Sequence, residues 1–170
     1  KIAESLRGVS GVPGRMEIVA KEPFTVIVDY AHNPSSFRAL YEAVKLVPHK
    51  RVIHAFGATG GGRDKGKRAE MGEIAARNAD LVIVTTDDSY DEDPGEIAKS
   101  VMAGVKAAGA VTACEILDRK EAIYSAIAEA QSGDLVLITG KGCEQLQIIG
   151  GKRLPWDDRT VVREALRSKS

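Results

Sequence analysis

Short apolar runs alternate along the chain with segments in which apolar residues recur at helical spacing. The runs are rich in Val, Ile and Leu, which is typical of strands buried on both faces of a sheet. Four clear runs and a weaker fifth predict strands over Phe24–Val28, Val52–Phe56, Leu81–Val84, Leu135–Ile138 and Ala113–Leu117.

Five segments have apolar residues three and four positions apart and predict helices. They lie after Pro34, over Lys67–Asn78, after Asp93, over Arg119–Gln131 and over Asp158–Leu166. The third helix has the clearest start. Asp93 can cap it, Pro94 suits its first position, and Glu96 can complete a capping box.

The alternation of strands and helices predicts an α/β fold. We expect a Rossmann-like, three-layer domain with a mostly parallel sheet of about six strands and small β-hairpins. In one hairpin, Met16–Ala20 pairs with Phe24–Val28. In the other, Gln147–Ile149 pairs with Arg153–Leu154.

Composition narrows the class of protein. The 170 residues suit one domain, and Lys plus Arg balance Asp plus Glu at 24 each. We therefore expect neither a nucleic-acid nor a membrane partner, since such partners favour a basic excess. Two cysteines give no disulfide framework, which favours a cytoplasmic location. Lys1–Gly14 reads as a helix end and a Gly/Pro linker, so we expect a domain of a longer protein.

Polar and glycine residues gather where the predicted strands end. Four such segments are Asp29–Pro34, Gly57–Arg68, Thr85–Asp93 and Gly140–Glu144. In open α/β sheets, ligands bind beyond the carboxyl ends of the strands. The four segments therefore predict one composite site.

The first segment, DYAHNP, has two interpretations. Asp29 could hold a ribose hydroxyl or a metal-bound water, and His32 and Asn33 could contact a base or a phosphate. Alternatively the segment is a strand-end turn, because Asn33 before Pro34 is good turn chemistry. The spacing alone does not separate the two.

The second segment, GATGGGRDKGKR, resembles a phosphate loop. It fits G-x-x-x-x-G-K, but Arg68 stands where a phosphate loop needs a Ser or Thr hydroxyl for magnesium. Its glycines allow close backbone approach, and Arg63 could bind a carboxylate through two hydrogen bonds. A solvated basic helix start is the alternative.

The last two segments differ in charge. Asp87 and Asp88 could bind a cationic amine, and Tyr90 could line a pocket. The alternative for Asp91–Asp93 is a solvated loop that ends in a helix cap. In GKGCE, Lys141 could meet phosphate and Glu144 offers a carboxylate.

The remaining cysteine and histidine residues give weaker signals. Cys143 is a weak nucleophile candidate, because no histidine lies near it in sequence. His49 and His54 lack the spacing of metal ligands, so we predict structural roles for both and no metal site.

Taken together, the motifs resemble the C-terminal domain of the Mur ligases. The motifs are GRME (Gly14–Glu17), VDYAHNP (Val28–Pro34), GGRDKGKRAEMG (Gly61–Gly72) and GKGCEQLQIIGGKRLPWDDR (Gly140–Arg159). DYAHNP is shared with folylpolyglutamate and cyanophycin synthetases. RDKGKR with GKGxE is more specific to the branch that adds the third amino acid in peptidoglycan synthesis.

The resemblance implies an ATP-dependent amide ligase that activates the carboxylate of UDP-N-acetylmuramoyl-L-Ala-D-Glu as an acyl phosphate. Residues 1–14 would then be a linker and helix end, and residues 15–170 the C-terminal domain. The UDP-sugar domain and the central ATPase domain would lie outside this chain. The central domain would make most of the contacts with ATP and Mg²⁺. The isolated domain would be inactive.

The resemblance also implies roles for particular residues. The expected ATP contacts are Arg15, Asp29, Tyr30, His32 and Asn33. The expected amino-acid site consists of Arg63, Asp87, Asp88, Ser89, Tyr90, Gly140 and Glu144. Lys65 and Lys141 are candidate phosphate contacts, and no catalytic residue is assigned.

The sequence departs from the family pattern at two places, and the first bears on specificity. Tyr90 replaces an Arg that would bind a second carboxylate, and Asp88 adds an acid. We therefore expect lysine or ornithine as the added amino acid, in preference to meso-diaminopimelate. Cys143 stands where the family usually has His. A cyanophycin- or folate-type ligase domain and a stand-alone nucleotide- or amino-acid-binding module are the alternatives.

Overall fold

The computed structural model describes residues 11–109 and 111–169. Its strands are β1 (Glu17–Ala20), β2 (Thr25–Asp29), β3 (Val52–Phe56), β4 (Leu81–Val84), β5 (Thr112–Glu115), β6 (Leu135–Thr139), β7 (Leu146–Ile149) and β8 (Lys152–Pro155). Its helices are α2 (Pro34–Val44), α3 (Gly66–Asn78), α4 (Pro94–Ala107), α5 (Arg119–Glu129) and α6 (Asp158–Lys169).

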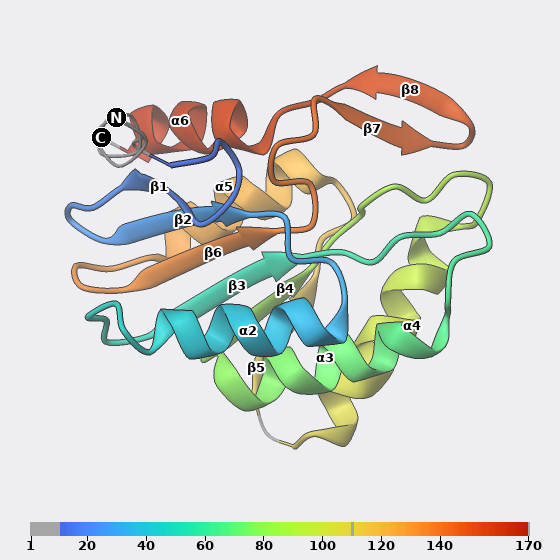
Figure 1. The fold of residues 1–170 in the computed structure, drawn as a ribbon, viewed down its shortest axis with the longest axis horizontal. Coiled ribbons are helices and arrows are strands. Elements are labelled where there is room, and N and C mark those ends of the chain that lie inside the picture. The colour runs from blue at the N-terminus through green and yellow to red at the C-terminus, as the bar shows by residue number, and fades with distance from the viewer. Residues whose placement is uncertain (1–10, 110, 170) are drawn as a thin grey trace, which may run out of the picture.

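Six strands form one sheet in the order β1-β2-β6-β3-β4-β5. The strand β1 is antiparallel to β2, and all other neighbours in this sheet are parallel. The strands β7 and β8 form a separate antiparallel hairpin. Figure 1 shows this hairpin projecting beyond the end of the sheet toward which the parallel strands point.

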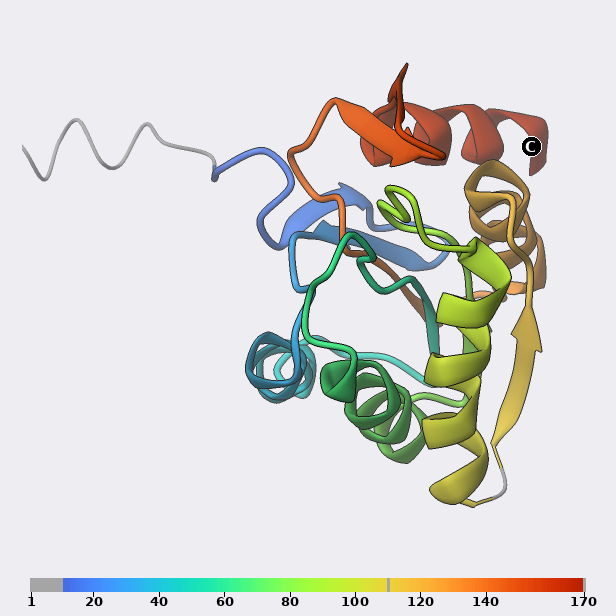
Figure 2. The same cartoon turned by 90° about the vertical axis from the view of Figure 1, so that its right-hand side faces the viewer.

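The path of the chain explains which helices cover which face. From β2 through β3 and β4 to β5 the chain advances across the sheet in one direction, and from β5 to β6 it returns. Parallel crossovers are almost always right-handed. The advancing connections therefore place α2, α3 and α4 on one face, and the return places α5 on the other, where α6 packs beside it (Figures 1 and 2).

Each face of the sheet has its own apolar core. On β6, Leu135 and Leu137 join the core under α2, α3 and α4, while Val136 and Ile138 join the core under α5 and α6. All four are fully buried. Burying such a side chain contributes about 1.5–3 kcal/mol, which is why the run Leu135–Ile138 is apolar at every position.

The imidazole of His54 is buried within the sheet without a charge. On β3, Nδ1 of His54 forms a hydrogen bond of 2.7 Å with the Tyr41 hydroxyl, and Nε2 forms one of 2.8 Å with the Thr139 hydroxyl. Burial lowers the pKa of His54 to about 3. The imidazole is therefore neutral near pH 7, as the structural role predicted for it requires.

The fold confirms the predicted α/β class, the mostly parallel six-strand sheet and both hairpin pairings. Element ends differ by a few residues, and α6 continues three residues beyond the predicted Leu166 to Lys169. Most of the expected linker, residues 1–10, lies outside the described residues. None of the helices within the described ranges combines the length and the apolar character of a transmembrane span.

Candidate functional site at the carboxyl edge of the sheet

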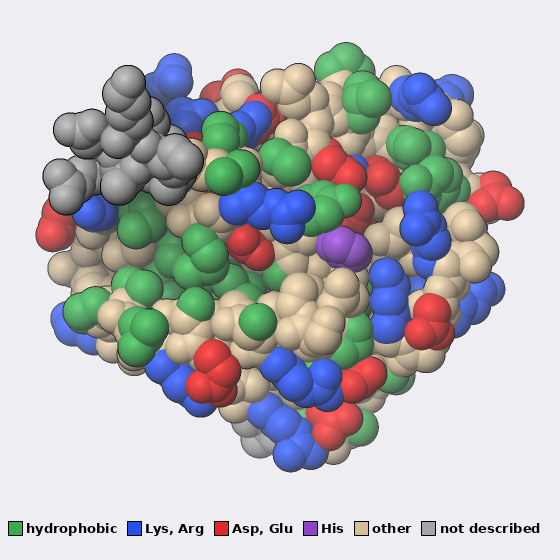
Figure 3. All heavy atoms as spheres, in the orientation of Figure 1, with side chains coloured by type: hydrophobic (Ala, Val, Ile, Leu, Met, Phe, Trp, Pro, Cys, Tyr) green, Lys and Arg blue, Asp and Glu red, His purple; other side chains and the backbone are tan. Residues whose placement is uncertain are grey.

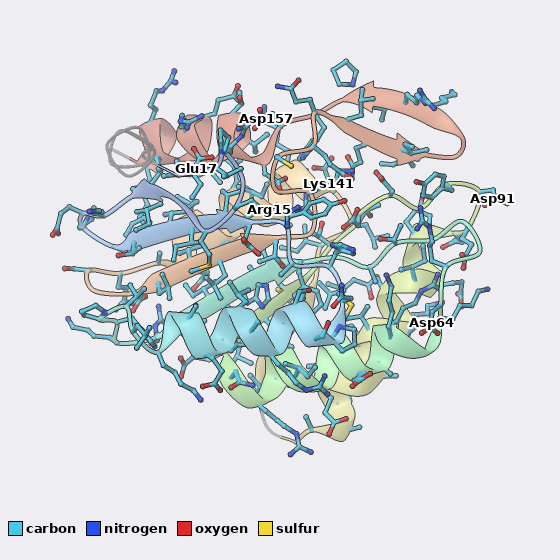
Figure 4. The ribbon with its side chains drawn as sticks, viewed as in Figure 1. Arg15, Glu17, Asp64, Asp91, Lys141 and Asp157 are labelled. Carbon is cyan, nitrogen blue, oxygen red and sulfur yellow. The ribbon has the colours of Figure 1, made fainter. Side chains whose placement is uncertain are left out.

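The ends of four parallel strands are level with one another. Asp29 of β2 and Phe56 of β3 both pair with Thr139 of β6, and Phe56 also pairs with Val84 of β4. The loops that follow these strands therefore begin side by side. Figure 2 looks toward this edge, and Figure 4 places Lys141 and Arg15 close to it.

The four loops enclose a cavity of about 120 Å³, here called the inner cavity. Eight residues predicted for the site line it: Tyr30, His32, Arg63, Asp87, Asp88, Tyr90, Gly140 and Glu144. Sequence reasoning did not assign two further lining residues, Thr59 and Lys67. Figure 3 shows acidic and basic side chains gathered around a histidine on this side of the molecule. The inner cavity thus brings two of the predicted ATP residues together with six of the predicted amino-acid residues, whereas Arg15, Asp29, Asn33 and Ser89 do not line it.

Lys141 joins the acids of two loops. Its ammonium is buried and lies 2.8 Å from Asp88 Oδ1 and 2.5 Å from Glu144 Oε2. Glu144 also accepts a hydrogen bond of 3.0 Å from the Tyr30 hydroxyl. Burial acts to lower the pKa of Lys141, but the carboxylates of Asp87, Asp88 and Glu144 outweigh it and raise this pKa. Lys141 therefore stays charged, and its contact with phosphate stays a prediction.

Asp87 packs directly against the backbone of Gly140. Gly140 has a φ of +112°, and a Cβ placed there would lie 2.4 Å from Asp87 Oδ2. Burial raises the pKa of the Asp87 carboxyl, while the nearby Arg119 and Lys141 cations oppose that rise. Only glycine suits this position, because it adopts the backbone conformation and leaves room for the carboxylate.

A buried ion pair between α5 and α6 stabilises the backbone next to the site. Arg119, at the start of α5, binds both carboxylate oxygens of Asp158, at the start of α6, with distances of 2.8 and 2.7 Å. It also donates to the Thr139 carbonyl at 2.9 Å, where β6 enters the Gly140 loop. Sequence reasoning did not identify this pair, because 39 positions separate its members.

In the basic loop after β3, some cations form ion pairs within the protein and Arg63 does not. Arg68 is buried and donates to both carboxylate oxygens of Glu92 at 3.1 Å, while Lys65 lies 3.2 Å from the same carboxylate. Within residues 11–109 and 111–169, the Arg63 guanidinium has no hydrogen bond or ion pair. Burial lowers the pKa of Lys67, which lies beside it on the cavity wall. Arg63 is thus available to a ligand, whereas Arg68 holds its loop to the loop that follows β4.

The DYAHNP segment forms the strand-end turn of its second interpretation, and the ligand contacts of the first stay a prediction. Asn33 caps α2 by accepting from the Ser36 amide at 2.9 Å, so it serves the turn. Asp29 accepts the amides of Met16 at 2.7 Å and Ala31 at 2.8 Å.

These Asp29 contacts fix the backbone next to Arg15, whose guanidinium lies 4.5 Å from the centre of the Tyr30 ring. That ring also meets the His32 ring edge to face at 4.7 Å. Arg15, Tyr30 and His32 therefore form one cluster, and their contact with ATP stays a prediction.

Tyr90 connects the loop Thr85–Asp93, here called the acidic loop, to the hairpin formed by β7 and β8. It has a φ of +54°, an uncommon conformation for a residue other than glycine. Its amide donates to the Ile148 carbonyl at 3.2 Å, and its carbonyl accepts the Gly151 amide at 2.9 Å. The neighbouring Ser89 is buried and binds the same Ile148 carbonyl through its amide. Both residues thus seat β7 against the site, and a role for Ser89 in amino-acid binding stays a prediction.

A second, larger cavity of about 620 Å³, here called the outer cavity, adjoins the first. Asp88, Tyr90 and Glu144 line both cavities. Cys143 lines only the outer cavity and is exposed. Among the described residues, no three His, Cys, Asp or Glu side chains group as metal ligands.

The sequence matches a known family and several curated proteins. Residues 14–142 match the family described as Mur ligase, glutamate ligase domain. A Gloeobacter violaceus protein named UDP-N-acetylmuramoyl-L-alanyl-D-glutamate--2,6-diaminopimelate ligase is 46% identical over 167 residues, or 97% of this chain and 34% of the relative. A Geobacillus thermodenitrificans protein of the same name is 46% identical over 99% of this chain and 34% of the relative. The chain spans about a third of the length of these relatives.

Solved structures agree with the sequence matches. A structure of UDP-N-acetylmuramoyl-L-alanyl-D-glutamate--2,6-diaminopimelate ligase superposes with a TM-score of 0.85 at 36% identity, over 98% of this chain and 34% of that one. A folylpolyglutamate synthase/dihydrofolate synthase from Yersinia pestis gives 0.58 at 20% identity, over 95% and 32%. A domain of a Haemophilus ducreyi protein gives 0.60 at 19% identity, over 92% and 100%. The last two likenesses show the fold alone.

The expected preference for lysine or ornithine over meso-diaminopimelate is wrong, because the relatives are named as 2,6-diaminopimelate ligases. The structure gives the physical reason. One Asp88 oxygen already accepts from the Lys141 ammonium and the Ile148 amide, both at 2.8 Å. With these contacts, and with only 12% of its side chain exposed, Asp88 is not the open acid that a cationic side-chain end would need.

The family match covers most of the chain, and the strand-end loops that carry its motifs enclose one site. The fold agrees with that of a solved diaminopimelate ligase over nearly the whole chain. This chain belongs to the Mur ligase family and contains its glutamate ligase domain.

Proposed function

We propose that this chain is the carboxy-terminal part of a longer, ATP-dependent ligase. The ligase joins meso-diaminopimelate to UDP-N-acetylmuramoyl-L-alanyl-D-glutamate as the third residue of the peptidoglycan peptide. The names of the relatives support this substrate pair, and the chain's span of about a third of their length supports its being part of a longer protein. On this proposal residues 15–170 are the C-terminal domain, and the UDP-sugar and ATPase domains precede it.

One observation carries the proposal: a free guanidinium and a carboxylate face the same cavity. Arg63 has no partner among residues 11–109 and 111–169, and Glu144 keeps 38% of its side chain exposed. A diamino acid has a carboxylate for the first and, at its far end, a second ammonium for the other. A guanidinium can hold a carboxylate by two parallel hydrogen bonds, which fixes orientation as well as position.

The neighbouring aromatic cluster suits a nucleotide. Arg15 covers the Tyr30 ring, and His32 meets its edge. Tyr30 and His32 line the inner cavity, so this cluster of one cation and two rings adjoins the amino-acid residues. Asp29 acts indirectly by fixing the backbone beside Arg15, and Asn33 acts by capping α2. Mur ligases use ATP and Mg²⁺, and ATP would supply the phosphoryl group that activates the substrate carboxylate.

The residues of this domain would orient the second substrate. With its carboxylate on Arg63, the amino acid presents its reacting amine toward the activated acyl carbon. The amine nitrogen forms the new amide bond while the acyl–oxygen bond to phosphate breaks, and the nitrogen loses a proton. Holding two reactants in a productive geometry supplies about 7–11 kcal/mol of the barrier reduction in favourable cases.

The test is a ligase assay of the full-length protein with UDP-N-acetylmuramoyl-L-alanyl-D-glutamate, ATP and Mg²⁺. Parallel reactions contain meso-diaminopimelate, lysine or no amino acid, and mass spectrometry identifies the product. We expect a tripeptide product and release of ADP and phosphate with meso-diaminopimelate. Absence of that product, in a protein that is folded and binds ATP, would refute the proposal.

A further inference from the structure

The outer cavity contains a cation that the proposed function does not use. Arg153 on β8 lines this cavity, and among the described residues its guanidinium has no hydrogen bond or ion pair. The other cation on the wall, Lys141, is already held by Asp88 at 2.8 Å and Glu144 at 2.5 Å. Arg153 is therefore the cationic group of this wall that is open to a ligand.

The register of the hairpin places the Arg153 side chain on the face that lines the outer cavity. Arg153 pairs directly with Ile148, and directly opposed residues of an antiparallel pair project from the same face. Both side chains line the outer cavity. The Ile148 amide in turn donates to Asp88 at 2.8 Å, and the Ile148 carbonyl accepts the Ser89 amide at 2.9 Å. The position of Arg153 is thus tied to the acidic loop.

The two cavities together match a ligand that is charged at both ends. The inner cavity has the free guanidinium of Arg63, and the outer cavity has that of Arg153. Glu144 lies on the wall that the cavities share and remains partly exposed. The loop Thr85–Asp93 contains no Lys or Arg, so it supplies no cation to the outer cavity.

From this arrangement we infer that Arg153 binds the distal carboxylate of the diamino acid and determines the preference for a substrate with two carboxylates. Arg63 holds the carboxylate at the reacting end, and Glu144 accepts from the distal ammonium. The hairpin strand β8 thereby supplies the guanidinium that the loop lacks. The inference rests on the proposed function and assigns the side-chain end of its substrate.

The test uses the full-length ligase with Arg153→Gln, Arg153→Lys and, as a matched control, Lys152→Gln. Lys152 is an exposed cation on the same strand, does not line either cavity, and neighbours Arg153, so its side chain leaves the opposite face. Steady-state kinetics give KM separately for meso-diaminopimelate, ATP and the UDP-dipeptide. A thermal melt of each variant checks its folding.

We expect Arg153→Gln to raise KM for meso-diaminopimelate about 10- to 100-fold with kcat changed less than about threefold, because one charge-assisted contact is lost. KM for ATP and the UDP-dipeptide should not change. Arg153→Lys should be intermediate, since it keeps the charge but loses the two-pronged geometry. Lys152→Gln should behave as the wild type.

Two results would overturn the inference. One is an Arg153→Gln variant with the same KM for meso-diaminopimelate as Lys152→Gln. The other is an equal rise of KM for all three substrates, which would indicate general damage to the hairpin. A wild-type enzyme that forms no product with meso-diaminopimelate would instead refute the proposed function, and this inference with it.

Discussion

Lys141 and Glu144 form an ion pair of 2.5 Å in which the ammonium is buried and the carboxylate remains 38% exposed. The same ammonium lies 2.8 Å from Asp88. One lysine therefore neutralises two acids that belong to different loops, and it leaves one of them open to the cavities. The ion pair links the stability of the domain to the shape of its site.

Replacement of Lys141 by Met should destabilise the domain by about 3 kcal/mol, because removing one partner of a buried ion pair leaves its acids uncompensated. Urea unfolding of the 170-residue chain measures the change. The control is Lys120→Met, since Lys120 pairs with Glu164 at 3.1 Å while 53% of its side chain is exposed. Exposed pairs contribute about 0–1 kcal/mol. Equal losses in the two variants would contradict the role given to Lys141.

Replacement of Gly140 by Ala should destabilise the domain more than replacement of Gly109 by Ala. Both glycines have a φ of +112°, so the backbone strain is matched. A Cβ at Gly140 would lie 2.4 Å from Asp87 Oδ2, whereas a Cβ at Gly109 meets nothing within 4 Å. The contact should add about 1–3 kcal/mol to the strain common to both. Denaturant midpoints of the two variants give the difference, and a difference of zero would show that Asp87 is not packed there.

The buried neutral His54 should make the domain less stable in mild acid. Burial lowers the His54 pKa from 6.5 to about 3. As pH falls below 6.5 the unfolded chain takes up a proton that the folded protein does not bind until about pH 3, so stability declines across this window. Between pH 7 and pH 5 this histidine should account for about 2 kcal/mol of loss.

A His54→Gln variant isolates this contribution, because glutamine does not titrate. Free energies of unfolding at pH 7 and pH 5 should fall less for the variant than for the wild type. An identical fall in both proteins would show that His54 is protonated in the folded state.

The fold was largely predictable because its signals are local. The run Leu135–Ile138 is apolar at every position, and the structure buries it on both faces as β6. Asp93 was predicted to cap a helix and does so by accepting from the Glu96 amide at 3.1 Å. The order of the strands was not predictable, because the position of β6 between β2 and β3 depends on contacts between segments far apart in sequence.

The site was predictable in location more than in detail. The strand-end rule placed Arg63 and Glu144 together, and they do line one cavity. The rule did not reveal that Arg68 is occupied by Glu92. Such pairings join distant segments, so residue types and spacing carry no signal for them. The lysine expectation failed for the same reason, since the sequence shows Asp88 but not the Lys141 ammonium that neutralises it.

The central claim is that the inner cavity binds the incoming amino acid through Arg63. The most direct measurement is kcat/KM for meso-diaminopimelate in full-length Arg63→Gln, beside an Arg38→Gln control. Arg38 is an exposed cation on α2 that pairs with Glu70. The account predicts a fall of at least about 30-fold for Arg63→Gln, from the loss of a charge-assisted carboxylate contact, and almost none for the control. A kcat/KM for Arg63→Gln equal to that of the control would contradict it.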